Sequence, residues 1–490
     1  MLELKALLIT YWIAYWPHIF FVVSVLASAA AAIHAAMTKS DVRAAIGWVG
    51  VALLSPLFGA LFYLVAGINR IRRPSRSGLA RASGLWHHGA TLDQQPVDVV
   101  AHSAPQFASL QVLGNRVSRF NVVGENAVAL LDGGMQTYPA MLDAIRHARR
   151  SIALQTYIFD NDPTGREVAS ALIEARRRGV QVRVLIDAVG ANYSLPPIVS
   201  MLHRAGVPTA RFNPAPWLFW RMPYANLRSH RKVLVVDSEI GFTGGMNIRA
   251  GFTTVRRNKP VNRDTHFKLE GPIVHQLMAV FAHDWDFTTH ESLLNPTWFP
   301  SDPVRRAGNV PARCILSGPD RYITSTHKML LGALAVAQKR VRIQSPYFLP
   351  DLVLIGALAT AARRGVKVDI VIPGANNLRM VDYAMTAQLD QVIRTGCRVW
   401  RNAGTFDHSK IMTVDDAWAY IGSSNMDPRS LRLNFELDTE LYDRATAVQL
   451  SERIDAAIAD STRVTLGSLY RLPFVKKLRN KLIWLASPYL

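Results

Sequence analysis

The stretch that decides the fold reads Arg176-Arg-Arg-Gly-Val-Gln-Val-Arg-Val-Leu-Ile-Asp187, and it recurs 186 residues later as Arg363-Arg-Gly-Val-Lys-Val-Asp-Ile-Val-Ile-Pro373. Each copy ends an arginine-rich helix at a glycine, which suits the residue after a helix, and continues into a short apolar run. Such runs are typical of strands that are buried on both faces. The stretch therefore predicts a helix and a buried strand that occur twice in one chain.

The repeat extends in both directions. Ser151-Ile-Ala-Leu-Gln-Thr-Tyr157 matches Val341-Arg-Ile-Gln-Ser-Pro-Tyr347, with the two tyrosines 190 residues apart, and further on Arg204-Ala-Gly206 matches Arg394-Thr-Gly396. Each copy reads helix, strand, helix, strand, which predicts an α/β fold with a helix-flanked mixed sheet in each copy. The offsets indicate two tandem domains of nearly equal length, not a short solenoid repeat. We place them at residues 115–300 and 301–462, with the boundary in the proline-containing loop 295–310.

A second repeated string carries polar residues in a fixed order. The first copy reads His230-Arg-Lys232-Val-Leu-Val-Val-Asp237 followed by Gly244-Gly245-Met-Asn247, and the second reads His408-Ser-Lys410-Ile-Met-Thr-Val-Asp415 followed by Gly422-Ser423-Ser-Asn425. Both copies fit the pattern H-x-K-x4-D-x6-G-[GS]-x-N. Two matches at the same place of an internal repeat are far more specific than one.

The apolar residues after each histidine predict a strand that begins at the histidine. Residues two apart share a face of a strand, so in each copy the histidine and the lysine would project together. Asp237 and Asp415 lie seven positions after the histidines and would face the other way. Although they belong to the catalytic motif, we expect these aspartates to hold backbone or loop donors and not to transfer protons.

The remaining motif residues suit contact with a ligand. Gly245 and Ser423 belong to small-residue pairs that let the backbone approach it, and Asn247 and Asn425 supply amide donors. If the two domains face each other across a pseudo-two-fold, both copies contribute to one site. Lysine and asparagine would then hold the oxygens of a phosphodiester, while one imidazole attacks phosphorus and the other protonates the leaving alcohol. We expect no metal and no other cofactor, because the sequence shows no carboxylate-rich metal motif.

Composition narrows the class of protein. Of 490 residues, 49% are apolar and 19% are charged, which excludes a largely disordered chain. Two cysteines, Cys314 and Cys397, exclude a disulfide framework and favour a reducing compartment for the main body. Lysine and arginine outnumber aspartate and glutamate by 56 to 36, a net charge of +20 that favours a polyanionic partner or an anionic membrane.

The N-terminal part looks like a membrane anchor. Residues 6–38 and 44–69 contain no Asp, Glu, Lys or Arg, and each run is long enough to cross about 30 Å of hydrocarbon. We predict a two-helix transmembrane hairpin over residues 1–69, followed by a basic linker over residues 70–114. The arginines that follow the second run place the catalytic domains on the cytoplasmic side by the positive-inside rule. A cleaved signal peptide is the alternative for the first run, since it contains an alanine-rich stretch.

Two further segments have membrane-like composition. Residues 463–490 contain six basic and no acidic residues between apolar ones, which predicts an amphipathic segment on anionic lipid. A helix face packed against the last domain is the alternative. The loop Trp217-Leu-Phe-Trp220-Arg-Met-Pro-Tyr224 either dips into the membrane or packs over a domain core.

The duplicated motif resembles the paired motifs of the phospholipase D superfamily, and the whole chain resembles the bacterial cardiolipin synthases. The stretches Asp160-Asn-Asp162-Pro-Thr-Gly165, Gln344-Ser-Pro-Tyr347-Phe-Leu-Pro350 and Ser487-Pro-Tyr-Leu490 extend the likeness. The resemblance implies two tandem phospholipase D-like domains and a phosphatidyltransferase of the bacterial inner membrane. It also implies that two phosphatidylglycerol molecules are joined into cardiolipin, with release of glycerol.

The resemblance further implies roles for single residues. His230 would form a phosphatidyl-histidine, and His408 would act as acid and later as base, although the near symmetry of the motifs leaves the reverse order open. Family members carry an acidic residue after each motif that orients its histidine. Asp264 fits that place after the first motif and Glu436 after the second.

Two other activities stay open. A membrane phospholipase D hydrolase would share all of these residues. Whether water or a lipid alcohol accepts the phosphatidyl group depends on how much water enters the cleft. A nucleic-acid phosphodiesterase fits the net charge, but the hydrophobic runs count against it, and no nucleic-acid partner is expected. Tyr157 and Tyr347 either touch the phosphate site or serve packing. Phosphatidylethanolamine is open as a donor, and the residues do not indicate an oligomeric state.

Overall fold

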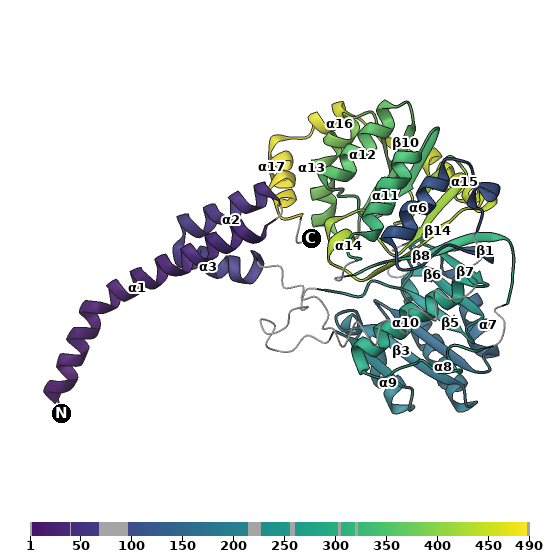
Figure 1. Ribbon diagram of the computed structural model, residues 1–490, viewed down its shortest axis with the longest axis horizontal. Coiled ribbons are helices and arrows are strands. Elements are labelled where there is room, and N and C mark those ends of the chain that lie inside the picture. The colour runs from purple at the N-terminus through teal and green to yellow at the C-terminus, as the bar shows by residue number, and fades with distance from the viewer. Residues whose placement is uncertain are drawn as a thin grey trace. The chain divides into compact units, whose positions relative to one another are not determined.

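The computed structural model describes residues 2–39, 41–67, 97–213, 227–254, 260–301, 305–318 and 322–487 (Figure 1). The predicted loop 217–224, the first part of the basic linker and residues 488–490 lie outside these ranges. The described residues fall into two units, the N-terminal helices and a main body that begins at residue 97, and each is considered separately.

The N-terminal unit contains one long helix, α1 (Leu2–Thr38), and a second hydrophobic run that is broken into shorter pieces. Within α1, Trp12–Thr38 is apolar enough and, at 27 residues, long enough to span a membrane. The second run forms α2 (Val42–Leu54), α3 (Pro56–Phe62) and a π-helical turn, η1 (Tyr63–Gly67). Because α2 has only 13 residues, it is shorter than the roughly 20 that a span requires. The structure therefore supports the predicted hairpin only in part, because one helix, α1, is long and apolar enough to span.

Proline explains the break. Pro56 lacks the amide hydrogen that would bond to the carbonyl of Ala52 in a continuous helix, and it stands at the first position of α3. The hydroxyl of Ser28 on α1 donates to that carbonyl instead, at 2.6 Å. The α3 backbone approaches α2 so closely that any side chain at Gly59 would collide with the carbonyl of Val51. The three helices therefore pack together, but as one long helix and two short ones.

The main body is built on one sheet of 15 strands, ordered β15-β11-β10-β9-β12-β13-β14-β8-β1-β7-β6-β5-β2-β3-β4. The strands of the first repeat are β1 (Val123–Asp132), β2 (Ser151–Thr156), β3 (Gln181–Asp187), β4 (Thr209–Phe212), β5 (Val233–Val236), β6 (Ile240–Gly244) and β7 (Thr265–Glu270). Those of the second are β8 (Val310–Ser317), β9 (Arg340–Gln344), β10 (Lys367–Pro373), β11 (Arg398–Asn402), β12 (Ile411–Val414), β13 (Trp418–Gly422), β14 (Glu436–Leu441) and β15 (Ser461–Val464).

The strand order confirms the pseudo-two-fold arrangement. From the antiparallel pair β1 and β8 outward, equivalent strands follow in the same order on both sides, and β15 is added at one edge. In each half the three strands farthest from the junction, apart from β15, are parallel, and the others are antiparallel, so each half is a mixed sheet as predicted.

Helices flank the sheet in both repeats (Figure 1). The first repeat has α7 (Gly133–His147), α8 (Pro163–Arg177), α9 (Ile198–Arg204) and α10 (Ile273–Thr289). The second has α11 (Ser325–Val336), α12 (Leu352–Arg363), α13 (Arg379–Ile393), α14 (Pro428–Arg432) and α15 (Arg444–Ala459). As predicted, α8 and α12 end just before Gly179 and Gly365, which adopt φ of 94° and 91°.

The chain outside the two repeats also packs on the body. Residues 97–114 belong to the stretch that we assigned to a basic linker, and together with residues 115–117 they contain α5 (Val99–His102) and α6 (Phe107–Val117). Phe107 and Leu110 lie in the hydrophobic core of the second repeat, so this part of the linker is structural. At the other end, α16 (Leu466–Tyr470) and α17 (Phe474–Leu485) pack against α13.

The aspartates that close the repeated motif form the turns between β5 and β6 and between β12 and β13. Asp237 and Asp415 both adopt φ of 54°, a left-handed conformation that aspartate tolerates better than most residues. The Asp237 carboxylate accepts backbone N–H bonds from Arg149, Arg150 and Ser151 at 2.7–2.9 Å. Asp415 accepts three equivalent bonds from residues 338–340 at 2.7–2.8 Å. These hydrogen bonds support the structural role that we expected for the two aspartates.

We expect Asp237→Ala to lower the free energy of unfolding by about 2 kcal/mol, because three amide donors lose a charged acceptor. Thermal unfolding of the detergent-solubilised protein measures this as a lower midpoint. Asp237→Asn should be milder, since asparagine tolerates the same φ and keeps one acceptor. The folded fraction should retain its specific activity. Full stability with lost activity would instead give Asp237 a role in the chemistry.

Candidate active site

The motif histidines and lysines lie just before a strand and not within it. β5 begins at Val233 and β12 at Ile411, so the prediction that the strand starts at the histidine is wrong by three residues in both copies. The expected shared direction still holds. Nζ of Lys410 lies 2.9 Å from Nδ1 of His408, and Lys232 and His230 both lie against the ring of Tyr157. Both lysines and His408 are buried.

Each histidine is held by the carboxylate of the other repeat. Nδ1 of His230 lies 3.1 Å from Oε2 of Glu436, and Nδ1 of His408 lies 2.9 Å from Oδ2 of Asp264. The expectation that each acid orients the histidine of its own motif is therefore wrong. Sequence distance suggested the nearer partner, whereas the pseudo-two-fold brings the acid of one repeat to the histidine of the other.

Backbone hydrogen bonds reinforce the exchange. The amide of His230 donates to the carbonyl of Phe435 at 2.8 Å, and the amide of His408 donates to the carbonyl of Arg263 at 2.8 Å. Phe435 and Arg263 immediately precede the acids that hold the same histidines. Main chain and side chain thus fix each histidine to the same short segment of the opposite repeat.

The small residues of the motif serve the acids. A Cβ at Gly245 would stand closer than 3.0 Å to both carboxylate oxygens of Asp264. At the equivalent place Ser423 is fully buried, and its hydroxyl donates to Oε2 of Glu436 at 2.6 Å. We predicted substrate contacts for Gly245 and Ser423. The structure gives each residue a different contact, since Gly245 leaves room for one carboxylate and Ser423 binds the other, and the substrate contacts stay a prediction.

The two asparagines are buried beside the strands that lead to the site. Oδ1 of Asn247 accepts a hydrogen bond from the amide of Ile158 at 3.1 Å. This bond fixes the side-chain amide and so sets the direction of its NH₂ group. Asn425 donates to Ser430 at 3.3 Å, and its Oδ1 has no hydrogen-bond partner among the described residues. The anchored Oδ1 of Asn247 is compatible with the predicted donor role.

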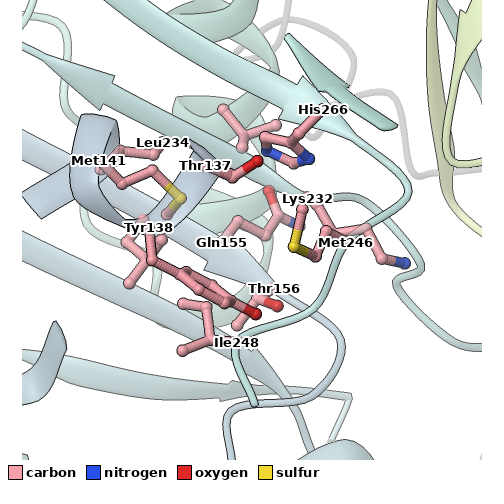
Figure 2. A pocket seen from close by; sticks show the side chains of 12 residues that line it. Thr137, Tyr138, Met141, Gln155, Thr156, Lys232, Leu234, Met246, Ile248 and His266 are labelled. Atoms are coloured by element: carbon pink, nitrogen blue, oxygen red, sulfur yellow. The ribbon is translucent and has the colours of Figure 1, made fainter. Parts of the chain in front are cut away.

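Burial makes the charged form of both lysines less stable. It lowers the pKa of Lys232 to about 7 and, opposed by Asp264 and Glu436, that of Lys410 to about 8. Figure 2 shows that the stem of Lys232 lines a small pocket and that its amine points away from this pocket. A cation held in such surroundings gains most from an anion that replaces its lost hydration.

The histidine pKa values are also low. Burial lowers the pKa of His230, while Glu436 opposes the shift. Burial, Lys410 and Lys232 together hold the pKa of His408 well below its ordinary value. These shifts favour neutral imidazoles, and a bound anion would shift both groups back toward their charged form.

Aromatic rings cover the histidines. Tyr157 lies 5.4 Å from the ring of His230, and Tyr347 lies 6.0 Å from the ring of His408, measured between ring centroids. The tyrosines are equivalent in the repeat, so the interpretation that they reach the site, not the packing alternative, agrees with the structure. Phe406, which the sequence did not single out, lies 5.9 Å from His408.

A buried ion pair that the sequence analysis missed supports the first motif. Arg231, between the motif histidine and lysine, bonds to Asp284 on α10 at 2.6 and 2.7 Å, and it also donates to the carbonyl of Glu436. In the second repeat the charges are exchanged, because Arg453 on α15 bonds to Asp407 just before the motif histidine. Asp284 and Arg453 lie far from the motifs in sequence, so nothing in the repeated string pointed to them.

The two halves differ behind the lysines. His266 is buried, burial lowers its pKa to about 4, and its Nδ1 has no hydrogen-bond partner among the described residues. The equivalent residue is Asp438, which accepts from Thr326 and Ser424. Among the described residues no group of three or more His, Cys, Asp or Glu side chains could hold a metal ion.

Comparison with known proteins places this geometry in a family. The family model described as "Cardiolipin synthase, PLD-like domain" matches residues 141–285 and 330–458, and the model "Phospholipase D-nuclease N-terminal" matches residues 26–67. The chain is 32% identical to cardiolipin synthase A of Pseudomonas aeruginosa, over 94% of this chain and 93% of that protein. It is 29% identical to cardiolipin synthase 1 of Bacillus cereus, over 91% and 89% of the two chains.

A solved structure shares the fold. The phosphatidylserine synthase of Haemophilus influenzae superimposes with a TM-score of 0.59 at 16% identity, over 78% of this chain and all of that one.

We expect Gly245→Ala to lower turnover by more than tenfold while the protein stays folded, because the new methyl group displaces the carboxylate that orients His408. Gly356→Ala on α12 is the matched control, since a Cβ there meets nothing within 4 Å. Steady-state turnover and thermal unfolding of both variants test this. Normal turnover of Gly245→Ala would show that the position of Asp264 is not critical.

Proposed function

The chain belongs to the cardiolipin synthase family of phospholipase D-like proteins, and from this membership we propose that it joins two phosphatidylglycerol molecules through a phosphatidyl-histidine. Its homologues over more than 90% of the chain make it a phosphatidyltransferase. The observation that carries the proposal is the exchange of acids, which brings two oriented histidines and two lysines into one buried site.

The donor step follows from the orientation of His230. Because Glu436 accepts the proton on Nδ1, the lone pair of Nε2 is the nucleophile. Nε2 attacks the phosphorus of the first phosphatidylglycerol, and the bond from phosphorus to the glycerol oxygen breaks. His408 gives its proton to that oxygen, so glycerol leaves and the phosphatidyl group stays on His230.

The acceptor step reverses these roles. Neutral His408 takes the proton from a headgroup hydroxyl of the second phosphatidylglycerol, and the hydroxyl oxygen attacks phosphorus. The phosphorus–nitrogen bond breaks, cardiolipin forms, and His408 is again protonated for the next donor. Lys232 and Lys410 stabilise the charge on the non-bridging oxygens in both steps, at little cost of reorganisation because they are fixed by burial.

We also propose where the reaction takes place. The apolar helix α1 associates the chain with a membrane, and we infer that this is the bacterial inner membrane. The arginines after residue 69 favour a cytoplasmic location of the catalytic domains. More than one pass through the bilayer finds no support in the short helices α2 and α3.

We expect the purified protein, with labelled phosphatidylglycerol as its only lipid, to produce cardiolipin and glycerol in equal amounts. Chromatographic separation of cardiolipin, phosphatidic acid and glycerol tests this, and added chelator should not change the yield. Phosphatidic acid as the sole lipid product would make the protein a hydrolase. His230→Ala and His408→Ala serve as controls that should each abolish turnover, and Met135→Ala, at an exposed position, should not.

We expect kcat/KM to fall as the pH rises through about 7 to 8. The lysines are charged below their lowered pKa values and neutral above them, so the free enzyme loses its attraction for the phosphodiester as the pH rises. Lys232→Arg keeps a charge at all these pH values and should extend activity to higher pH, although with a lower maximum. A pH profile of the parent protein that stays flat to about pH 9 would contradict this role of the lysines.

A further inference from the structure

Large exposed apolar side chains of the main body gather in two places. The first comprises loops and helix starts that follow β3, β9 and β10, with Val189, Tyr193, Leu195, Leu352, Val353, Leu378 and Met380. We call these residues the rim. The second is α17 with the end of α16, where the exposed residues are Tyr470, Phe474, Val475, Leu478, Leu482 and Leu485. Only five other large apolar residues of the described main body are exposed.

Part of the rim lies close to the two motif histidines. Tyr193 packs against Tyr157, with ring centroids 6.2 Å apart, and Tyr157 packs against His230. On the other side the hydroxyl of Tyr347, which covers His408, donates to Asn377 at 2.8 Å. Leu378 is the next residue. Exposed apolar rim residues therefore lie near both histidines.

Helix α17 has one face packed and one face open. On the packed face Arg479 lies 3.6 Å from the ring centroid of Tyr383 on α13, and Lys481 donates to the carbonyl of Ala387 at 2.7 Å. Ile483 and Trp484 pack against the core of the second repeat. The open face carries Phe474, Val475, Leu478, Leu482 and Leu485, spaced as neighbours on one side of a helix.

Helix α13 joins the two places. It begins at Arg379, between the rim residues Leu378 and Met380, and α17 packs along it (Figure 1). Helix α13 thus connects the rim to α17, whose open face is apolar. Single exposed apolar residues are ordinary, but a gathered set of this kind marks an interaction surface.

The charges on this surface select its partner. Arg379, Arg471, Lys476 and Lys477 are exposed, and residues 463–487 contain no acidic side chain. Apolar side chains flanked by lysine and arginine suit the interface of an anionic bilayer, where the rings and aliphatic chains enter the acyl boundary and the cations meet headgroups. A protein partner would instead have to cover the active site.

We propose that the rim and the open face of α17 form one membrane-docking surface, which lies on an anionic phospholipid bilayer and holds the mouth of the active site at headgroup level. The proposal rests on a lipid substrate for this site. It explains how two phospholipids reach the histidines without taking their acyl chains through water.

Site-directed spin labels on the full chain test the proposal without turnover. Labels are placed at Met380→Cys in the rim, Val475→Cys on α17 and, as control, Val448→Cys on α15, an exposed valine outside both places. Native Cys314 and Cys397 are buried and should not react. The protein is reconstituted in phosphatidylcholine vesicles with and without phosphatidylserine, and the accessibility of each label to oxygen and to an aqueous nickel complex is measured.

We expect the labels at 380 and 475 to favour oxygen several-fold more than the label at 448, and more strongly with phosphatidylserine. Equal aqueous accessibility at all three positions would overturn the proposal. Protection from both reagents, together with dipolar broadening between labels, would also overturn it and would identify a second copy of the chain as the partner.

Charge reversal separates docking from chemistry. The double variant Lys476→Glu with Lys477→Glu should move the label at 475 toward water and lower turnover several-fold in phosphatidylserine vesicles, but not in detergent micelles. Lys339→Glu with Lys367→Glu makes the same charge change at the starts of β9 and β10 and should have neither effect. An equal loss of turnover in micelles would show a catalytic or folding defect and contradict docking. If the parent protein is inactive in both media but its labels lie in the bilayer, only the proposed reaction is refuted.

Discussion

The structure depends on one exchange: the carboxylate that orients each motif histidine comes from the opposite repeat. His230 is held by Glu436 and the carbonyl of Phe435, and His408 by Asp264 and the carbonyl of Arg263. Neither repeat can form a competent site alone, because an imidazole without its acceptor loses both its tautomer and its direction. The continuous sheet through β1 and β8 provides the rigid junction that this exchange requires.

The electrostatics of the site follow from that assembly. Burying two lysines costs solvation, and the two exchanged acids offset part of this cost while they hold the histidines. The lowered pKa values of lysine and histidine alike describe a site that is short of negative charge. A phosphodiester bound there would supply that charge, which is the basis of the role proposed for the two lysines.

The surface carries a second requirement, since the substrates are lipids. A buried polar site is useful to such an enzyme only if its mouth meets the bilayer, and exposed apolar rim residues lie near both histidines. Pro56 has a contrasting effect in the N-terminal unit, where it breaks a hydrophobic run into helices too short to span. Composition marked both N-terminal hydrophobic runs as membrane-like. Only the backbone geometry distinguishes the long helix of the first run from the short packed helices of the second.

The sequence alone determined the duplication, the α/β class, the helix stops at Gly179 and Gly365, and the identity of the histidines and lysines, because periodicity and repeated spacing are local properties of a chain. It also indicated a structural task for Asp237, since seven positions along a strand reverse the direction of a side chain. Only the tertiary structure decided which acid meets which histidine, that Ser423 serves Glu436, and that Asp284 anchors Arg231. These contacts join residues far apart in the chain across a pseudo-two-fold, and sequence spacing carries no information about which of two equivalent partners such a symmetry brings together.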